Sequence, residues 1–540
     1  MHKIVRVALS RKGNREFTGR IIETFESLND PEVELAIVQE ARGFPSDFSD
    51  AAIQVAKSSQ RQLGDSSRRV DLTKTNHVTI DGETARDFDD AICVTQVSKN
   101  IFNLKVSIAD VSHFVPENSA LDREAFERGT SIYFPDRAIP MLPEILSNNL
   151  CSLVPKEERY TLTCDMDINR QGEIVRSSIY PSKILSQARL TYTIAAQVVE
   201  KGQRGLVRTD LEEMLVLAHE LALIVRNRRR EKGGLDLDLP ETEMEIDRTG
   251  NVLRTYISER NEAHKLIEDF MILANECVSE SIEKAGYSSV FRIHEDPDPL
   301  KIERLQKIVK RWGFSLSMSR DLEDSIQRFL DSIREHRDTK ILAVSLLRSL
   351  KQARYSATNA GHFGLGSESY THFTSPIRRY PDLMVHRILR NSNFLKAKAE
   401  PYAFDKLEQM SNACSDTERR AFFAERDMED LKKVRYMEGF VGETFDGLVV
   451  SVKNFGLFVE ILPHGVEGLI PFRNLPPDHW NVDELETVLK GSRTHKEYWL
   501  GDRLKVKVAR VDRFKRQIDL QPIIENPKGQ RKKGSNVRWV

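Results

Sequence analysis

Four aspartates crowd into one short segment of the sequence. Asp81, Asp87, Asp89 and Asp90 fall within ten residues, and the apolar run 91–94 follows directly. Carboxylates this close repel one another, and the repulsion grows where a segment is drawn into the low dielectric of a fold. A divalent cation would remove that conflict, because hard cations such as Mg²⁺ or Mn²⁺ take oxygen ligands from carboxylates, substrate phosphate and water. The cluster therefore indicates an open metal site suited to phosphodiester cleavage.

The acidic segment has three other interpretations. A pair of adjacent aspartates is by itself more typical of a solvated loop. An EF-hand needs acidic residues at alternate positions and a central glycine, whereas Glu83 and Ala85 follow Asp81 and the sixth position holds no glycine. A phosphoaspartate loop would need a threonine at the position of Ala91. The remaining candidate is a metal-dependent nuclease.

A second motif, at 370–382, combines adjacent arginines with prolines. Pro376 favours an extended residue before it and predicts that a helix begins there, which would put Arg378 in the first turn. A helix amino terminus beside an arginine attracts phosphate. The alternative is that Arg378 and Arg379 pair with acids such as Asp382. Tyr192 and Phe291 likewise have two interpretations, since each is either a core aromatic or a ring that stacks on unpaired bases.

The helices and strands expected around these groups are those of an α+β protein. The 540 residues allow three or four domains. Up to about residue 45, short segments in which apolar and polar residues alternate predict strands. A helical stretch and a linker follow, and a large domain of mixed helices and strands extends from about 70 to 440. Within it, the apolar spacing over 263–274 predicts an amphipathic helix. Short strands return between 442 and 523, with Lys505 and Lys507 alternating against apolar neighbours, as in an OB-type barrel.

Composition limits the partner and the compartment. The net charge is −1, so a nucleic-acid partner must be argued from local clusters. The five cysteines form no CxxC pair, which favours a reducing compartment. Neither a secretory segment nor a run of apolar residues long enough to span a membrane is present. We expect a cytoplasmic protein, without a membrane partner, that acts as a monomer.

Six segments together resemble the ribonuclease II/ribonuclease R family of exoribonucleases, and its ribonuclease R branch in particular. They are 80–92, 108–114, 133–137, 146–153, 361–365 and 371–382. The resemblance extends over roughly residues 17 to 523. It implies a processive hydrolase that degrades single-stranded RNA from the 3′ end and releases nucleoside 5′-monophosphates, using one or two Mg²⁺ or Mn²⁺ ions.

The resemblance also implies residue roles. Asp81, Asp87, Asp89 and Asp90 fall on the metal-binding positions, and Asp87, Asp89 and Arg378 fall on the catalytic ones. Tyr192 and Phe291 fall on an aromatic pair that clamps the terminal bases. In the C-terminal barrel, which resembles an S1-type RNA-binding domain, the expected RNA-contacting residues are Phe455, Phe458, Phe472, Arg473, Lys505 and Lys507.

The implied domains form a linear series. They are a partial cold-shock OB remnant (1–45), a helical linker (46–70), an exoribonuclease domain of the RNB type (71–440), the S1-type OB domain (441–523) and a basic tail (524–540). Two competing functions were considered: a catalytically silent RNA-binding protein, and a metal-dependent phosphatase. Retention of the aspartates and Arg378 disfavours the first, and the OB module disfavours the second.

Overall fold

The chain divides into two compact units. One contains residues 1–241 and 258–429, and the other contains residues 242–257 and 430–540. The computed structural model describes residues 4–11, 17–27, 29–45, 47–59, 68–236, 241–258, 260–317, 322–391 and 402–523. The predicted basic tail and residues 60–67 of the predicted linker lie outside these described residues.

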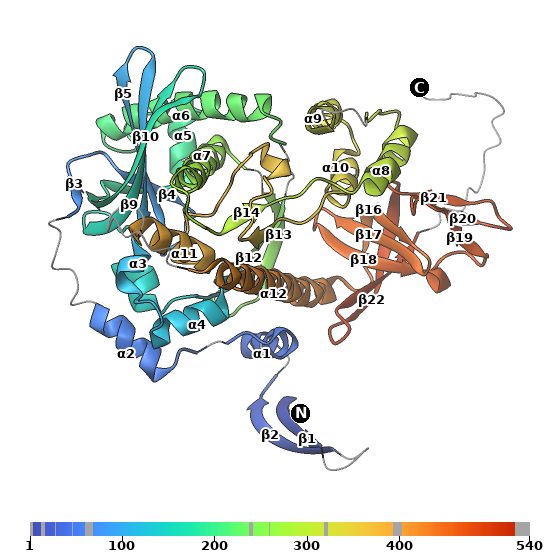
Figure 1. Ribbon diagram of the computed structural model, residues 1–540. Coiled ribbons are helices and arrows are strands. Elements are labelled where there is room, and N and C mark those ends of the chain that lie inside the picture. The colour runs from blue at the N-terminus through green and yellow to red at the C-terminus, as the bar shows by residue number, and fades with distance from the viewer. Residues whose placement is uncertain are drawn as a thin grey trace. The chain divides into compact units, whose positions relative to one another are not determined.

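A seven-stranded mixed sheet organises the first unit (Figure 1). In spatial order its strands are β11 (Ala188–Thr191), β4 (Val78–Asp81), β5 (Asp90–Ser98), β6 (Ile101–Ala109), β9 (Glu158–Asn169), β10 (Ile174–Leu185) and β3 (Val70–Leu72). Strand β6 is buried at consecutive positions, as expected where both faces of a sheet are covered. The helices that pack against the sheet are α5 (Tyr192–Val199), α6 (Thr209–Glu231) and α7 (Glu262–Lys284).

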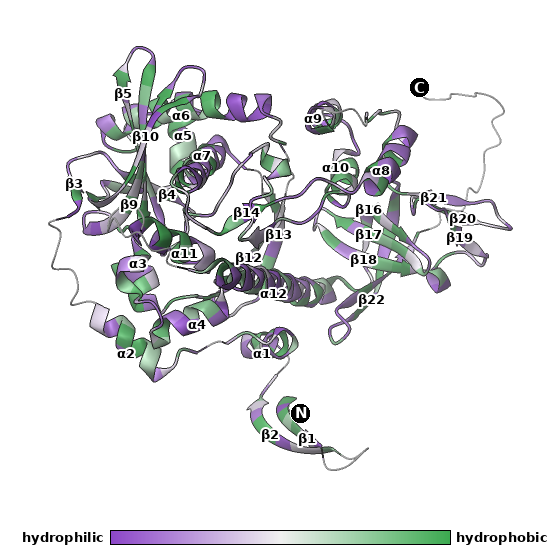
Figure 2. Ribbon diagram, in the orientation of Figure 1, coloured by the Kyte–Doolittle hydropathy of each residue, from purple (hydrophilic) through white to green (hydrophobic). Residues whose placement is uncertain are grey.

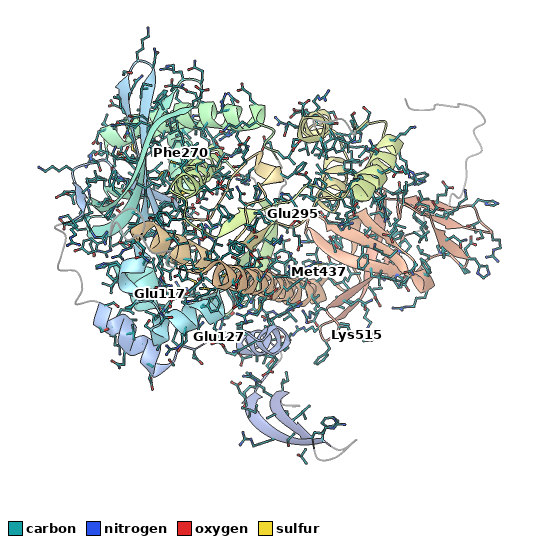
Figure 3. All side chains as sticks on the ribbon, in the orientation of Figure 1. Glu117, Glu127, Phe270, Glu295, Met437 and Lys515 are labelled. Atoms are coloured by element: carbon teal, nitrogen blue, oxygen red, sulfur yellow. The ribbon has the colours of Figure 1, made fainter. Side chains whose placement is uncertain are left out.

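Helix α7 confirms the amphipathic helix predicted over 263–274. Asn261 caps it, because its side-chain oxygen accepts the backbone N–H groups of Ala263 and His264, both at 3.1 Å. Phe270, labelled in Figure 3, is fully buried in the core between helix and sheet. Truncating such a side chain to alanine costs about 3–5 kcal/mol. The core thus fixes α7, which also lines the candidate site.

The first unit has further α-helices, of which several pack on this core and those within residues 299–347 form a separate hydrophobic cluster. They are α1 (Pro31–Arg42), α2 (Asp50–Ser59), α3 (Val111–Phe114), α4 (Ala120–Arg128), α8 (Pro299–Arg311), α9 (Leu322–Ile333), α10 (Thr339–Leu347) and α11 (Tyr380–Leu389), followed by α12 (Phe404–Met437), which continues into the second unit. Helix α12 is mainly hydrophilic (Figure 2). Among the described residues, no helix combines the length and apolar character needed to cross a bilayer.

Three pairs of short strands complete the first unit. They are β1 (Ile4–Arg11) with β2 (Phe17–Phe25), β7 (Ile132–Tyr133) with β8 (Ala138–Ile139), and β14 (Phe291–Ile293) with β15 (Arg354–Ser356).

The N-terminal region differs from the expectation of strands alone. Helix α1 follows the β1–β2 hairpin within 1–45. Asp30 caps this helix, Pro31 occupies its first turn, and Gly43 ends it in the left-handed conformation at φ 65°. These start and stop signals outweigh the apolar and polar alternation on which the strand prediction relied.

The second unit contains the predicted OB-type barrel. Its closed order is β16 (Thr444–Lys453), β17 (Gly456–Leu462), β18 (Val466–Pro471), β23 (Gln517–Pro522) and β22 (Arg503–Asp512). A three-stranded sheet and a hairpin accompany it: β19 (Trp480–Val482), β20 (Val488–Gly491) and β21 (Glu497–Trp499), and β12 (Glu241–Ile246) with β13 (Val252–Ser258). The α+β class with a C-terminal OB barrel is therefore confirmed.

Candidate active site

The four aspartates lie within one segment made of two paired strands and the loop between them. Asp81 ends β4 and Asp90 begins β5. Ser152 holds the loop between them, because its hydroxyl donates to the Arg86 carbonyl at 2.7 Å and accepts the Phe88 N–H at 3.0 Å. A strand–loop–strand unit anchored in this way keeps the carboxylates together within the fold.

Arg378 reaches this loop from a segment nearly three hundred residues later. Its Nε lies 3.5 Å from Asp89 Oδ2, and the backbone N–H of Ile377 donates to Asp89 Oδ1 at 2.8 Å. Arg379 instead donates to Asp382 at 2.7 Å, so the ion-pair alternative describes that arginine. Asp89 therefore connects the acidic loop to the arginine motif, and Arg378, whose side chain is 46% exposed, lines the cavity.

The segment before α11 is a turn, and the prediction that a helix begins at Pro376 is wrong. Helix α11 has Pro381 in its first turn, so Arg378 precedes the helix. The backbone N–H of Arg379 donates to the Ser375 carbonyl at 2.9 Å and closes the turn. The second proline takes the position that suits a helix start, because its missing N–H needs no partner there. Phosphate attraction at this site thus depends on the arginine side chain.

These groups line a cavity of about 360 Å³, which we call the catalytic cavity. Its acidic lining residues are Asp81, Asp87, Asp89, Asp90 and Glu268. Burial raises the pKa of Asp89 above its ordinary value, and burial together with the charge of Asp90 raises the pKa of Asp81. The ionised carboxylates are thus costly in the protein alone, and a bound cation would lower that cost.

The donor set fits a divalent cation completed by substrate and water. Asp81 Oδ2 and Asp89 Oδ2 are buried and accept no hydrogen bond. Among the described residues, no three Asp, Glu, His or Cys side chains are grouped closely enough to hold an ion by themselves. Mg²⁺ sites in proteins commonly use one or two carboxylates with substrate phosphate and waters. The orphaned carboxylate oxygens are compatible with that kind of open site.

The aromatic residues have different positions. Tyr192 lines the catalytic cavity, and its ring stacks on His264 at 3.8 Å between centroids. Phe291 is 5% exposed in β14 and is absent from the described lining of the cavity, so its position matches the core alternative rather than base stacking. Tyr133, which was not singled out as a site residue, donates its hydroxyl to Asp87 Oδ2 at 2.6 Å. The sequence feature that could have identified Tyr133 is its position in segment 133–137, one of the six segments that carry the family resemblance.

A second cavity, of about 410 Å³, shares Glu268 with the catalytic cavity. We call it the basic cavity, since its cationic lining residues are Arg226, Arg229, Arg260, Lys265 and Lys351. Asp269 lies between Arg226 and Arg229, at 2.8 Å from a nitrogen of each. Five cationic side chains face three carboxylates in the described lining, and Glu262 and Glu295 also form ion pairs with members of the cationic group. Sequence reasoning missed this group because its members are scattered over 226–351.

The barrel of the second unit presents several of its predicted RNA-contacting residues to solvent. Phe455 is 50% exposed and meets Phe458 edge to face, at 6.0 Å between centroids. Lys505 and Lys507 are exposed on β22, whereas Val506 between them is buried. Arg473 is exposed and ion-paired with Asp519 at 2.8 Å, and Phe472 is partly buried. The surface combines aromatic and cationic groups.

Comparisons with known proteins agree with this arrangement. Residues 69–393 match the family described as RNB domain, and residues 438–521 match the S1 RNA binding domain. The chain is 40% identical over 518 residues to ribonuclease R of Thermotoga maritima, covering 94% of this chain and 73% of that protein. It is 37% identical over 485 residues to ribonuclease R of Escherichia coli, covering 87% of this chain and 59% of that protein.

The fold is similar to that of a solved relative. The structure of Mycoplasma genitalium RNase R in complex with ribose methylated single-stranded RNA superposes with a TM-score of 0.88 at 30% identity. The match covers 94% of this chain and 80% of that one.

Proposed function

This chain belongs to the RNB-domain family, in the ribonuclease R group of 3′–5′ exoribonucleases, and we propose that its catalytic cavity hydrolyses single-stranded RNA processively to nucleoside 5′-monophosphates. The observation that carries the proposal is the meeting of Arg378 with Asp89 at one cavity that also contains Asp81, Asp87 and Asp90. An acidic loop and an arginine from a distant segment form the two halves of a phosphodiester site.

In this proposal Asp81, Asp87, Asp89 and Asp90 supply the protein ligands for one or two divalent cations, Mg²⁺ or Mn²⁺. When bound, such an ion supplies a Lewis acid that activates water and offsets charge on the scissile phosphate. Arg378 contributes hydrogen bonds to the phosphate oxygens as negative charge develops on them. Asp89 keeps that guanidinium beside the loop.

The basic cavity supports a path for the chain next to the site of cleavage. Phosphates of the nucleotides that precede the scissile bond would meet its arginine and lysine side chains. Tyr192 lies in the wall of the adjoining catalytic cavity and would stack on a base. The cationic and aromatic contacts are independent of base identity, which suits a processive enzyme.

The test is digestion of a 5′-labelled single-stranded oligomer. With Mg²⁺ we expect products shortened one nucleotide at a time and free nucleoside 5′-monophosphates, and with a chelator we expect an intact chain, because the carboxylates then lack their cation. Metal-independent shortening would overturn the metal mechanism. Binding without any release of nucleotides would favour the silent RNA-binding protein, and inorganic phosphate from an intact chain would favour the phosphatase.

The barrel surface is proposed to add phosphate contacts through its exposed lysines. The double variant Lys505→Gln/Lys507→Gln should lower the slope of log affinity against log salt by about 1.4, since each phosphate contact to a single strand contributes roughly 0.7. Fluorescence anisotropy with labelled RNA at several salt concentrations measures this slope. Lys490→Gln, at an exposed lysine of β20 in the same unit, is the control. An unchanged slope in the double variant would remove these lysines from the RNA-binding surface.

We also propose that the protein acts as a monomer in the cytoplasm. The five cysteines are buried free thiols, as a reducing compartment allows. Analytical ultracentrifugation of the purified protein would measure the oligomeric state directly.

A further inference from the structure

A third cavity, of about 580 Å³, adjoins the catalytic cavity at a different wall from the basic cavity. It shares Ala85, Asp87 and Tyr133 with the catalytic cavity, whereas the basic cavity shares Glu268. In the described lining it has no residue in common with the basic cavity. The catalytic cavity therefore adjoins the basic cavity on one side and the third cavity on another, and it shares different residues with each.

The wall toward the third cavity is a pair of side chains. The Tyr133 hydroxyl donates to Asp87 Oδ2 at 2.6 Å, and the backbone N–H of Tyr133 donates to Glu425 at 2.8 Å. A tyrosine hydroxyl is protonated at neutral pH, so the phenol can act as the donor in this pair. Because the backbone of Tyr133 is anchored while its side chain makes the partition, rotation of one side chain would join the two cavities.

The third cavity opens to solvent and has the size of a ligand pocket. Several of its lining residues are exposed: Thr84, Arg86, Pro135, Ala138 and Glu144. Its volume lies within the range of roughly 300–1,000 Å³ found for small-molecule sites. A mononucleotide therefore has room to pass from the catalytic cavity to bulk solvent.

The charges of the third cavity favour passage over retention. Three carboxylates, of Asp87, Asp136 and Glu144, face the guanidinium groups of Arg86 and Arg137 in the described lining. Arg137 is also ion-paired with Glu32 at 2.6 Å. Hydrolysis converts a phosphodiester with one charge into a phosphomonoester with about −1.5 to −2 at pH 7. Such a product is held weakly here, because carboxylates outnumber guanidinium groups in this lining.

We propose that the third cavity is the exit route for the released nucleoside 5′-monophosphate, with the Tyr133–Asp87 pair as its partition. The inference rests on the proposed exoribonuclease activity. A chain that occupies the basic cavity blocks the way back for the nucleotide just cut from its end, so the product needs another opening. The third cavity provides one, and the chain can then advance by one nucleotide without dissociating.

The experiment fills the third cavity with a tryptophan side chain and measures the rates of successive cleavage steps. A 5′-labelled single-stranded RNA is bound to the enzyme without metal, hydrolysis is started with Mg²⁺, and chain lengths are resolved on the millisecond to second scale. In Ala138→Trp we expect the first nucleotide to be removed at the wild-type rate, and later steps to slow by about 10-fold or more because product release becomes limiting. RNA shortened by one nucleotide then accumulates.

A second variant that fills the third cavity and a control variant complete this test. Glu144→Trp places the tryptophan on a different segment of the lining of the third cavity. We expect the same accumulation of RNA shortened by one nucleotide, so one folded variant is enough for the test. Ala51→Trp, at an exposed alanine of α2 outside the described lining of all three cavities, should show wild-type steps.

Three results would overturn the exit route. In the first, the folded variants Ala138→Trp and Glu144→Trp match the wild type at every step. In the second, they slow the first step as much as the later ones. In the third, a wild-type enzyme that never shortens the RNA would overturn the proposed function itself, and with it the exit.

Discussion

Asp89→Asn is expected to abolish nucleotide release while leaving RNA binding largely intact. The substitution keeps the shape of the side chain and an oxygen that can accept the Ile377 N–H, which Asp89 binds at 2.8 Å. It removes the negative charge that faces Arg378 Nε at 3.5 Å and that would ligate a cation. Loss of several kcal/mol of metal-assisted stabilisation corresponds to a fall in kcat of at least about 10³-fold.

Two measurements separate this effect from unfolding. RNA affinity in the presence of a chelator, measured by fluorescence anisotropy, should stay near the wild-type value. The melting temperature without metal should not fall, because burial disfavours the ionised carboxylate that asparagine replaces. Asp324→Asn, at an exposed carboxylate of α9, serves as the matched control with full activity. Substantial hydrolysis by Asp89→Asn with Mg²⁺ present would refute the assignment.

Arg378→Lys is expected to lower kcat by about 10²-fold, the scale seen when one transition-state donor is removed. Lysine keeps the positive charge but lacks the planar fork that donates two parallel hydrogen bonds to a phosphate. The side chain is 46% exposed and lines the cavity, so the loss should concern catalysis more than stability. Single-turnover rates at saturating enzyme report the chemical step directly.

The control for this variant is a second arginine-to-lysine change. Arg328 lies on α9, is 68% exposed and pairs with Asp324 at 2.9 Å, so Arg328→Lys should leave the single-turnover rate unchanged. If Arg378→Lys also kept the wild-type rate, the bidentate contact to the scissile phosphate would be excluded. A loss confined to RNA affinity would place Arg378 in substrate binding alone.

The local elements around the site could be predicted from short-range pattern. The apolar spacing of 263–274 gave helix α7, and the alternation around Lys505 and Lys507 gave strand β22 of the barrel. Both predictions succeeded because a helix or a half-buried strand imposes its own period on the chain. Prediction failed where two signals compete: Pro376 and Pro381 both suit a helix start, and the helix begins at the second.

The candidate site was only partly predictable, for a related reason. The acidic cluster is contiguous, so its chemistry is visible in ten residues. Tyr133 contacts Asp87 across 46 positions, a separation at which no local pattern indicates a contact. Phe291 illustrates a different limit, since the identity of an aromatic residue does not reveal whether its ring faces a cavity or the core, and in the structure this side chain is buried.

By itself the sequence indicated the type of chemistry, because four carboxylates in one short segment favour a divalent cation once the fold buries them. Only the tertiary structure decided which cationic and acidic side chains from distant parts of the chain lie around that segment. Arg378 meets Asp89 across 289 positions, and the basic cavity collects side chains from 226 to 351. Such groupings follow from how the sheet and helices bury apolar surface together, a property of the whole chain that no local period encodes.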